Sequence, residues 1–579
     1  MITIRLMGGL GNQMFQYALG RRLVHENDVP LALDLSWFAS QEKRQFELDQ
    51  WQISDTYNIK IMNRLETKLK SYHYFNRVTN FLKKNIQPGR YWYLKEQSPG
   101  CFDRRILNCR KFCILEGYWQ SEKYFSPIVD ALRQTFIPIN SLPKPDQTIL
   151  KQITKDPLSV CMHVRRGDYT SDYSTMAVHY ICTPDYYREA YTAMREKLGQ
   201  EPNVYLFSDE PDWCLKEFKD EWPNITIISN RCRSSVHEMY LMSQCKHHII
   251  PNSSFSWWSA WLCDHLQKIV IAPARWLNNH QTPDLVPEHW KKIKHNDKND
   301  WKYIDIPYAK KRYNLTFGRT LNLDQPKSFT EKLQWLKIYY RKPIMTTWAD
   351  KISARELVQE ILGKKYLTTV FGIFENADEI DFNNLPQKFI FKTNHGSEWN
   401  IVCNNKNQLN LTKTKKLLSE WLSKNYYYLG REWVYKGIKP AILCEELLDF
   451  SESTSSFMDY KIFCFHGKAK IIQAGLVKSI PHGYFDLQWK EIPIDDSYQK
   501  WPGSIQKPIN LSDLITIAEK LSDGFPFVRV DLYNNNKKIY FGEMTFHPAN
   551  GFKIFLSYDI DLGLGNLINL PIENHGPKN

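Results

Sequence analysis

The sequence predicts an α/β fold for its first half and a separate α+β fold for its second half. Over residues 1–290, short apolar runs alternate with helical stretches, a pattern typical of parallel sheets covered by helices on both faces. Near residue 300 a polar, charged segment lacks hydrophobic periodicity, and strand pairs joined by short turns lie beyond it. A chain of 579 residues is also too long for one hydrophobic core, so at least two domains are expected.

The first half is expected to form two lobes, at about residues 1–140 and 150–290. Residues 126–157, which contain five prolines, are expected to connect them. A linker is expected at 291–309, and the α+β region at 310–579. The apolar runs predict strands at 2–6, 31–35, 112–120, 158–163, 203–207, 225–228, 248–250 and 269–272, and helices at 13–24, 184–198, 211–219, 235–244 and 256–265.

One stretch of the first lobe, residues 60–86, carries apolar residues at near-helical spacing together with several lysines and arginines. Two interpretations remain open. The stretch is either a helix with a solvated face, or a basic helix that binds anionic lipid at the inner face of a membrane. In the second case the chain could act as a lipid-anchored scaffold.

Composition limits the kinds of partner. A net charge of +13 favours anionic ligands such as nucleotide sugars or ATP. Nucleic acid is a less favoured partner, because the sequence contains no recognisable nucleic-acid-binding module. The 12 cysteines form no C-x-x-C pair, which favours reduced thiols over zinc ligands or disulfides. No signal peptide is visible at the start, and no apolar run reaches the roughly 18 residues of a membrane span. We therefore expect a cytoplasmic protein that at most makes peripheral contact with the inner membrane.

The stretch His163-Val-Arg-Arg-Gly-Asp-Tyr169 is the first candidate for a functional site. It follows a predicted buried strand, and open α/β sheets bind ligands beyond the carboxyl ends of their strands. Two adjacent guanidiniums are costly to bury unless an anion lies against them, and a diphosphate is the obvious candidate. Alternate residues of an extended chain face opposite ways, so one arginine should bind the ligand and the other support the scaffold. The alternative interpretation is a surface loop of ion pairs without a ligand.

Two further stretches follow predicted strands and begin predicted helices. The glycine turn Met7-Gly-Gly-Leu-Gly-Asn-Gln13 can direct unpaired backbone N–H groups at an anion. Asn252-Ser-Ser-Phe-Ser256 places three hydroxyl groups at a helix N-terminus, where a phosphate would bind favourably, beside three tryptophans. Asp209 ends another strand and is either a nucleotide ligand or the cap of the next helix.

Together and in this order, these stretches resemble the bacterial α-1,2-fucosyltransferase family over about residues 1–290. The resemblance implies a GT-B-like pair of Rossmann-type lobes and an inverting transfer of fucose from GDP-fucose to a galactoside hydroxyl, with no cofactor. The acceptor it implies is a galactose-containing glycan or lipid-linked oligosaccharide, in surface polysaccharide or O-antigen synthesis. Arg165 is assigned to the negative charge that grows on the departing GDP. The substrate-binding residues expected are Gly9, Gly11, Asn12, Gln13, His163, Arg166, Asp209, Asn252, Ser254 and Ser256.

No spacing marks the general base that would take the proton of the acceptor hydroxyl. Asp168, Glu116 and Asp34 are the candidates, and Asp168 and Glu116 join Arg165 as expected catalytic residues. The aromatic pair Tyr118 and Trp119 is expected either to face the acceptor sugar or to pack in the core.

The second half places charged residues on successive predicted strands. Lys392 ends one apolar run, Glu445 and Glu446 end the next, and Lys461 lies within a third. A final predicted strand pair, 527–533 and 538–545, carries Arg529, Asp531 and Glu543.

This order resembles the ATP-grasp fold over about residues 310–570, and within it the branch linked with teichuronopeptide synthesis. The resemblance implies that the lysines hold the phosphates of ATP, that Glu445 or Glu446 meets adenine and ribose, and that Asp531 and Glu543 carry Mg²⁺. Arg529 is also expected to bind ATP. Similar enzymes place an asparagine where this chain has Thr545. The second half is therefore either an ATP-dependent modifying domain that uses Mg-ATP or a noncatalytic docking module.

Overall fold

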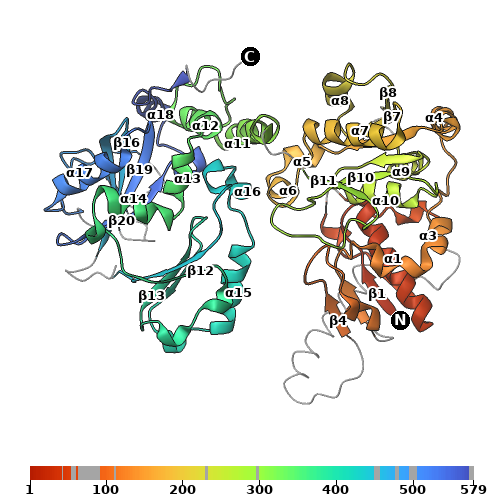
Figure 1. Ribbon diagram of the computed structural model, residues 1–579, viewed down its shortest axis with the longest axis horizontal. Coiled ribbons are helices and arrows are strands. Elements are labelled where there is room, and N and C mark those ends of the chain that lie inside the picture. The colour runs from red at the N-terminus through yellow and green to blue at the C-terminus, as the bar shows by residue number, and fades with distance from the viewer. Residues whose placement is uncertain are drawn as a thin grey trace. The chain divides into compact units, whose positions relative to one another are not determined.

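A computed structural model of the chain describes residues 1–41, 44–53, 60–62, 92–109, 113–228, 233–294, 299–448, 457–475, 482–494 and 505–572. The chain divides into two compact units, Met1–Asn299 and Asp300–Asn579 (Figure 1). Each unit has its own sheets and its own hydrophobic clusters. The predicted order of an α/β half followed by an α+β half is confirmed.

The first lobe of the first unit is a five-stranded parallel sheet in the order β3-β2-β1-β5-β4. Its central strand, β1 (Ile2–Arg5), leads through the glycine turn into helix α1 (Leu10–Asn27), which packs on the sheet. The remaining strands are β2 (Leu31–Asp34), β3 (Lys60–Met62), β4 (Trp92–Lys95) and β5 (Cys113–Glu116), with single turns at Phe38–Ser40, Leu48–Gln50 and Arg104–Asn108.

The predicted basic helix at 60–86 requires a correction. Residues 60–62 form strand β3 and not the start of a helix. The backbone of β3 pairs in parallel with β2 and so extends the sheet at its edge. The rest of the predicted helix lies outside the described residues. The proline-rich connection at 126–157 contains two helices, α3 (Val129–Thr135) and α4 (Lys144–Lys155), after short turns at Glu122–Tyr124 and Ser126–Ile128.

The second lobe is a six-stranded parallel sheet in the order β11-β10-β9-β6-β7-β8. The strand order reverses at β6 (Ser159–Val164), so the carboxyl end of β6 opens at the position where such sheets bind ligands. The other strands are β7 (Asn203–Ser208), β8 (Ile225–Ile228), β9 (His247–Ile249), β10 (Val270–Pro273) and β11 (Lys291–Ile293). The helices are α5 (Gly167–Ser171), α6 (Tyr173–Val178), α7 (Pro184–Leu198), α8 (Pro211–Phe218), α9 (Ser235–Ser243) and α10 (Ser254–Leu262).

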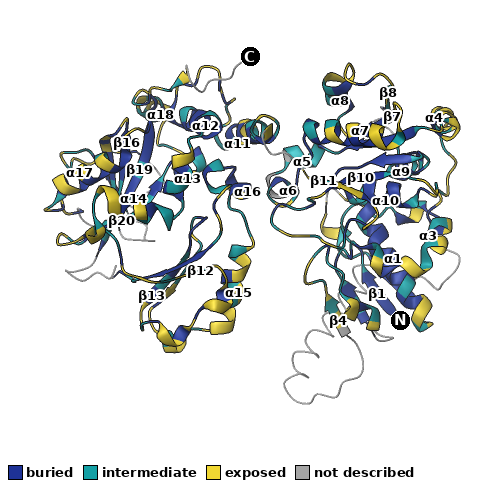
Figure 2. Ribbon diagram, in the orientation of Figure 1, coloured by how far each residue is buried: buried dark blue, intermediate teal, exposed yellow. Residues whose placement is uncertain are grey.

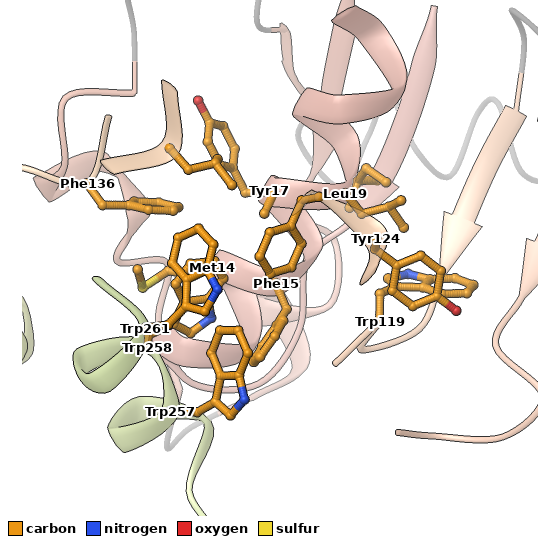
Figure 3. Packing of buried hydrophobic residues seen from close by; sticks show 14 of the residues in the cluster. Met14, Phe15, Tyr17, Leu19, Trp119, Tyr124, Phe136, Trp257, Trp258 and Trp261 are labelled. Atoms are coloured by element: carbon orange, nitrogen blue, oxygen red, sulfur yellow. The ribbon is translucent and has the colours of Figure 1, made fainter. Parts of the chain in front are cut away.

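The two lobes share one hydrophobic cluster, which lies between α1 and α10. Trp257 and Trp258 are fully buried there, with ring centroids 4.5 and 5.0 Å from the ring of Phe15 on α1 (Figure 3). Trp261 stacks on Trp257 in the same cluster. These tryptophans fix the two lobes against each other and do not offer their rings as platforms for a sugar.

The second unit contains two antiparallel sheets. The first has the order β12-β15-β13-β14 and the second the order β18-β17-β16-β19-β20. Figure 2 shows that the strands of the second sheet are mostly buried. The strands are β12 (Val370–Phe374), β13 (Phe389–Thr393), β14 (Asn400–Cys403), β15 (Ile442–Glu445), β16 (Met458–Phe465), β17 (Lys468–Gly475), β18 (His482–Phe485), β19 (Phe527–Asn534) and β20 (Ile539–Thr545).

Helices of the second unit surround these sheets. Residues 329–361 form three consecutive helices, and a proline begins the second of them. No described helix of the chain combines the length and the apolar character that a bilayer span requires. The helices are α11 (Ile306–Phe317), α12 (Phe329–Tyr339), α13 (Pro343–Ala349), α14 (Ser353–Ile361), α15 (Leu411–Leu422), α16 (Tyr427–Gly430), α17 (Leu511–Ser522) and α18 (Tyr558–Gly565), and a π-helical turn, Trp301–Asp305, precedes α11.

Candidate active site

A cavity of about 650 Å³ opens between the two lobes of the first unit, at the carboxyl end of β6. All three sequence motifs of the first half contribute to its lining. Residues expected in the site that line it are Gly9, Gly11, Asn12, His163, Arg165, Asp168, Asp209 and Ser254. Further lining residues include Trp37, Arg44, Glu47, Tyr118, Gln120, Tyr169, Thr175, His179, Glu238, Ser253 and Trp276.

Arg165 lies in this cavity with its guanidinium held by two carboxylates. Its Nη2 lies 2.7 Å from Asp168 Oδ1 and its Nη1 lies 3.0 Å from Asp209 Oδ2. Burial alone would lower the pKa of Arg165, but these carboxylates raise it, so the guanidinium stays charged. A fixed cation at the end of a central strand is suited to an anionic ligand.

Arg166, the next residue, points to different surroundings. Its Nε lies 3.0 Å from Glu210 Oε2, and its guanidinium carbon lies 3.8 Å from the centre of the Trp213 ring. Its backbone N–H donates to Asp209 at 3.0 Å. Arg166 is buried and does not line the cavity. Its role is therefore to support the loop that carries Arg165.

His163 lines the cavity as a neutral imidazole. Burial, with a smaller contribution from Arg165, lowers the pKa of His163 to about 3. Its Nδ1 is hydrogen-bonded to Ser256 Oγ, which is fully buried behind the lining. Asn252 also lies behind the lining, where its Nδ2 donates to the carbonyls of Tyr180 and Trp276 at 2.6 and 2.9 Å. Ser256 and Asn252 therefore position neighbouring groups.

The N-termini of α1 and α10 meet at the cavity. A Cβ on Gly11 would lie 2.5 Å from the carbonyl carbon of Ser254 and 2.6 Å from the backbone nitrogen of Phe255, so only glycine permits this approach. Both helices direct unpaired N–H groups toward the same space, which favours a bound anion.

Two amides hold the glycine turn in place. Gln13 lies behind the lining, where its Nε2 donates to the carbonyls of Gly8 and Gln45 at 3.2 and 2.8 Å. Asn12 Oδ1 accepts a hydrogen bond of 2.7 Å from Gln120 Nε2.

The structure places two proposed general bases away from the cavity. Glu116 and Asp34 both form ion pairs with Arg5, at 2.5 and 3.0 Å, and neither belongs to the lining. The two carboxylates balance a cation at the end of the first sheet, which explains their position. Tyr118 does line the cavity, whereas Trp119 is buried in the core.

Two titratable lining residues were missed by sequence reasoning. Glu238 lies in the first turn of α9, and burial raises its pKa to about 7. His179 follows α6, and burial lowers its pKa. Neither belongs to a motif with recognisable spacing, so only residue type could have drawn attention to them.

In the second unit, most of the residues predicted to bind ATP or Mg²⁺ lie in two clusters of oppositely charged side chains. Glu445 is buried, with Lys392 Nζ at 2.6 Å and Arg355 Nη1 at 2.9 Å, and it accepts a hydrogen bond from Thr368. Burial alone would raise the pKa of Glu445, but Lys392 and these partners lower it. Glu446 instead accepts a hydrogen bond from the backbone N–H of Thr369.

The second cluster surrounds Asp531. Arg529 binds both of its oxygens, at 2.6 and 2.7 Å, and Lys461 Nζ lies 2.9 Å from one of them. Glu543 stands opposite Asp531 in the β19–β20 register, and its Oε1 lies 3.7 Å from Arg529 Nη2. Burial alone would raise the pKa of Asp531, but its two cationic partners lower it.

This pair of carboxylates fits Mg²⁺ by donor type. Mg²⁺ in nucleotide sites uses one or two carboxylates together with phosphate oxygens, and Asp531 and Glu543 supply two on one face of a rigid hairpin. Thr545, where an asparagine was expected, donates to Glu543 at 3.2 Å. Over the described part of the chain, no group of three or more His, Cys, Asp or Glu side chains could hold a metal ion by itself.

Comparison with known proteins gives a family match for each unit. The model of glycosyl transferase family 11 matches residues 1–305, and the model of the TupA-like ATP-grasp domain matches residues 331–569. An Escherichia coli protein named alpha-1,2-colitosyltransferase is 33% identical over 300 residues, which cover 50% of this chain and 98% of the relative. The E. coli O-antigen biosynthesis glycosyltransferase WbnK is 31% identical over 314 residues, covering 49% of this chain and 98% of the relative.

A more distant likeness is found among solved structures. Fucosyltransferase NodZ from Bradyrhizobium is 14% identical, with a TM-score of 0.27, over 45% of this chain and 92% of NodZ.

Proposed function

Because the chain belongs to glycosyl transferase family 11, we propose that its first unit transfers fucose from GDP-fucose to a hydroxyl of a galactose-containing glycan, with inversion and an α-1,2 linkage. Membership of this family shows that the chain is a glycosyltransferase. The identity of the donor, the identity of the acceptor and the linkage are what we propose. The name of the second E. coli relative supports a product in O-antigen synthesis. The name of the first relative also makes GDP-colitose the alternative donor.

The position of Arg165 carries this proposal. When the acceptor oxygen attacks the anomeric carbon, the bond to the β-phosphate oxygen breaks and its electron pair leaves with GDP. Negative charge therefore grows on the β-phosphate, and a fixed guanidinium stabilises it more in the transition state than in the ground state. The N-terminus of α10 adds about 0.3–1 kcal/mol for an anion at its first turn. No cofactor is needed in this scheme.

Glu238 supports a guanine base over the other common bases. Among the described residues, no ion pair or hydrogen bond is found for its carboxyl group, which lines the same cavity as Asp209 and Arg165 and interacts electrostatically with both. Guanine presents N1–H and an exocyclic amino group side by side, and one carboxylate can accept from both. Adenine presents an acceptor at N1, which the same carboxylate would repel.

A donor panel tests the proposal. The full chain is incubated with a galactose-terminated acceptor and, separately, with GDP-fucose, GDP-colitose, GDP-mannose or UDP-galactose, and each product is identified by NMR. We expect a new α-1,2-linked fucose, with little transfer from the last two donors. Transfer of colitose but not fucose would select the alternative donor, and transfer from UDP-galactose alone would refute the proposal.

For the second unit we propose binding of Mg-ATP. Lys392, Lys461 and Arg529 would contact the phosphates, Glu445 the nucleoside, and Asp531 with Glu543 the metal ion, which would neutralise charge on the phosphates. Support comes from the two charge clusters and from the TupA-like ATP-grasp match. The alternative is a noncatalytic docking module.

Titration of the full chain with Mg-ATP separates these two roles. We expect saturable binding that falls at least tenfold in Lys392→Ala and in Glu543→Gln, because each removes one charged contact. As a matched control, Lys413→Ala alters an exposed lysine at the start of α15 and should leave binding unchanged. If the unaltered chain binds no ATP, the docking role is the correct one.

A further inference from the structure

The carboxylates considered as general bases are all engaged elsewhere. Glu116 and Asp34 balance Arg5 outside the cavity. Asp168 lines the cavity, but its Oδ1 lies 2.7 Å from Arg165 and its Oδ2 lies 2.8 Å from Arg44. Both oxygens of this carboxylate are therefore occupied by ion pairs. The cavity therefore needs another group to take a proton from the acceptor.

His179 is fixed at the lining of the same cavity. Its backbone N–H donates to Thr175 O at 2.8 Å, and its carbonyl accepts from Asn278 Nδ2, also at 2.8 Å. Its ring stacks on the Tyr169 ring, with centroids 4.8 Å apart and an interplanar angle of 25°. Tyr169 is held in turn by a hydrogen bond from its hydroxyl to Asn252 O. The imidazole is thus held in one orientation beside the arginine motif.

The ring nitrogens of His179 are not committed to structure. Its Nδ1 is buried without a hydrogen-bond partner, and Nε2 makes no hydrogen bond among the residues that the structure describes. His163, which lines the same cavity, differs, since its Nδ1 is hydrogen-bonded to Ser256 Oγ. A buried polar atom without a partner is unusual in a folded protein and calls for an explanation.

The charges around His179 suit a base that becomes protonated only briefly. Burial lowers its pKa, so the ring is neutral with a free lone pair near pH 7. Asp168 acts in the opposite direction and would stabilise the imidazolium, while Arg165 disfavours it. These two groups and the Tyr169 ring are the charged and titratable side chains that face His179 from α5 and the end of β6.

The arrangement of the cavity puts His179 on the sugar side. Arg165 marks the pyrophosphate, and Glu238 with Asp209 lies toward β7, where the guanine is proposed to bind. His179, Thr175 and Trp276 all line the cavity, and His179 forms an antiparallel bridge with Leu277, just beyond the end of β10. The donor sugar and the acceptor would occupy this part.

We propose that His179 is the general base of the transfer reaction, an inference that rests on the proposed function. As the acceptor oxygen bonds to the anomeric carbon, its proton passes to an imidazole nitrogen. The bond from the anomeric carbon to the β-phosphate oxygen breaks, and the electron pair leaves with GDP. The imidazolium then releases its proton to solvent, so atoms and charge balance.

The test compares His179→Asn and His179→Ala with the unaltered full chain. We expect kcat to fall by about 10²–10⁴-fold, the usual contribution of a positioned base. The Kd for GDP should change less than about threefold, because the phosphate and guanine contacts remain. Added imidazole should restore part of the activity of His179→Ala. His25→Asn, an exposed histidine in the last turn of α1, is the matched control and should behave as the unaltered chain.

A pH profile gives a second readout that needs no variant. Because only the neutral ring accepts a proton, kcat of the unaltered chain should fall on acidification below pH ~6.5, the ordinary pKa of histidine. Near-normal kcat in both variants, or a kcat of the unaltered chain that does not fall down to the lowest pH at which the chain stays folded, would overturn the proposal for His179. If the unaltered chain transfers no sugar from any GDP donor, the proposed function is wrong, whatever the role of His179. If the unaltered chain is active and the two variants are equally active, only the proposal for His179 is wrong.

Discussion

At the residue scale, two neighbouring arginines of identical chemistry have different surroundings. Arg165 lies in the cavity between two carboxylates, whereas Arg166 stacks on Trp213 and pairs with Glu210. Sequence reasoning anticipated one arginine of each kind, because alternate residues of an extended chain diverge. It could not tell which was which, since the direction depends on Asp209 and Trp213, which are more than forty residues away.

Substitution of the two arginines should separate their roles. Arg165→Lys should lower kcat by about 10²–10³-fold, because a lysine cannot replace the fixed fork that stabilises the departing phosphate. Arg166→Lys should instead lower the free energy of unfolding by about 0.5–3 kcal/mol through lost stacking and ion pairing. Steady-state kinetics and denaturant titration check both. Equal kcat losses with unchanged stability would contradict this division.

Glu238 predicts a pH dependence of nucleotide binding. Its pKa is raised to about 7, so the carboxyl group is largely protonated below that pH and can no longer accept from both guanine donors. The Kd for GDP should therefore rise by up to about tenfold as the pH falls from 8 to 6, because the ionised fraction of a carboxyl group with a pKa of about 7 falls about tenfold over this range.

Calorimetric titration with GDP at several pH values checks this dependence. In Glu238→Gln the Kd should be weaker and independent of pH over this range. Glu196→Gln, at an exposed position of α7, is the control that should retain the dependence. A Kd for GDP that is constant from pH 6 to 8 in the unaltered chain would show that Glu238 does not contact the base.

At the element scale, the strands of the parallel sheets could be predicted because each is a contiguous apolar run. β7 and β8, for example, begin at the predicted residues. β12 was not predicted, because Gly372 interrupts its short apolar run, and as an edge strand it exposes Val370, Phe371 and Ile373. The tryptophans of α10 belong to the core. Sequence alone cannot distinguish a tryptophan ring that packs in the core from one that binds a sugar.

The contact between α1 and α10 gives a prediction at this scale. Gly11→Ala should force the two helix N-termini apart, because the added Cβ would meet backbone atoms of Ser254 and Phe255 that cannot rotate away. We expect a GDP affinity at least tenfold weaker and a loss of about 1–3 kcal/mol in the free energy of unfolding. In Gly563→Ala, on α18, the Cβ meets nothing within 4 Å, so no such loss should occur. Unchanged GDP binding in Gly11→Ala would show that this helix contact does not shape the phosphate site.

At the scale of the whole molecule, each hydrophobic cluster lies entirely within one unit. The alpha-1,2-colitosyltransferase relative is matched over 98% of its length by 300 residues of this chain, which is about the first unit. The sequence indicated the junction by its loss of periodicity near residue 300. It could not show how His179 and Glu238 join the cavity, because only tertiary folding brings their helices to the end of β6.

The first unit should therefore function alone. A chain of residues 1–299 should unfold cooperatively and transfer sugar with a kcat within about threefold of the full chain, because its core and cavity need no residue of the second unit. Thermal unfolding and the transfer assay check this. An aggregated or inactive fragment would show that the second unit is required for folding or catalysis.

The most direct test of the whole account is a crystal structure of the full chain with GDP. We predict that the β-phosphate lies within hydrogen-bonding distance of the Arg165 guanidinium and of the backbone N–H groups at the start of α10, with guanine against Glu238. GDP bound elsewhere, or a β-phosphate remote from Arg165 with the guanidinium turned to solvent, would contradict it.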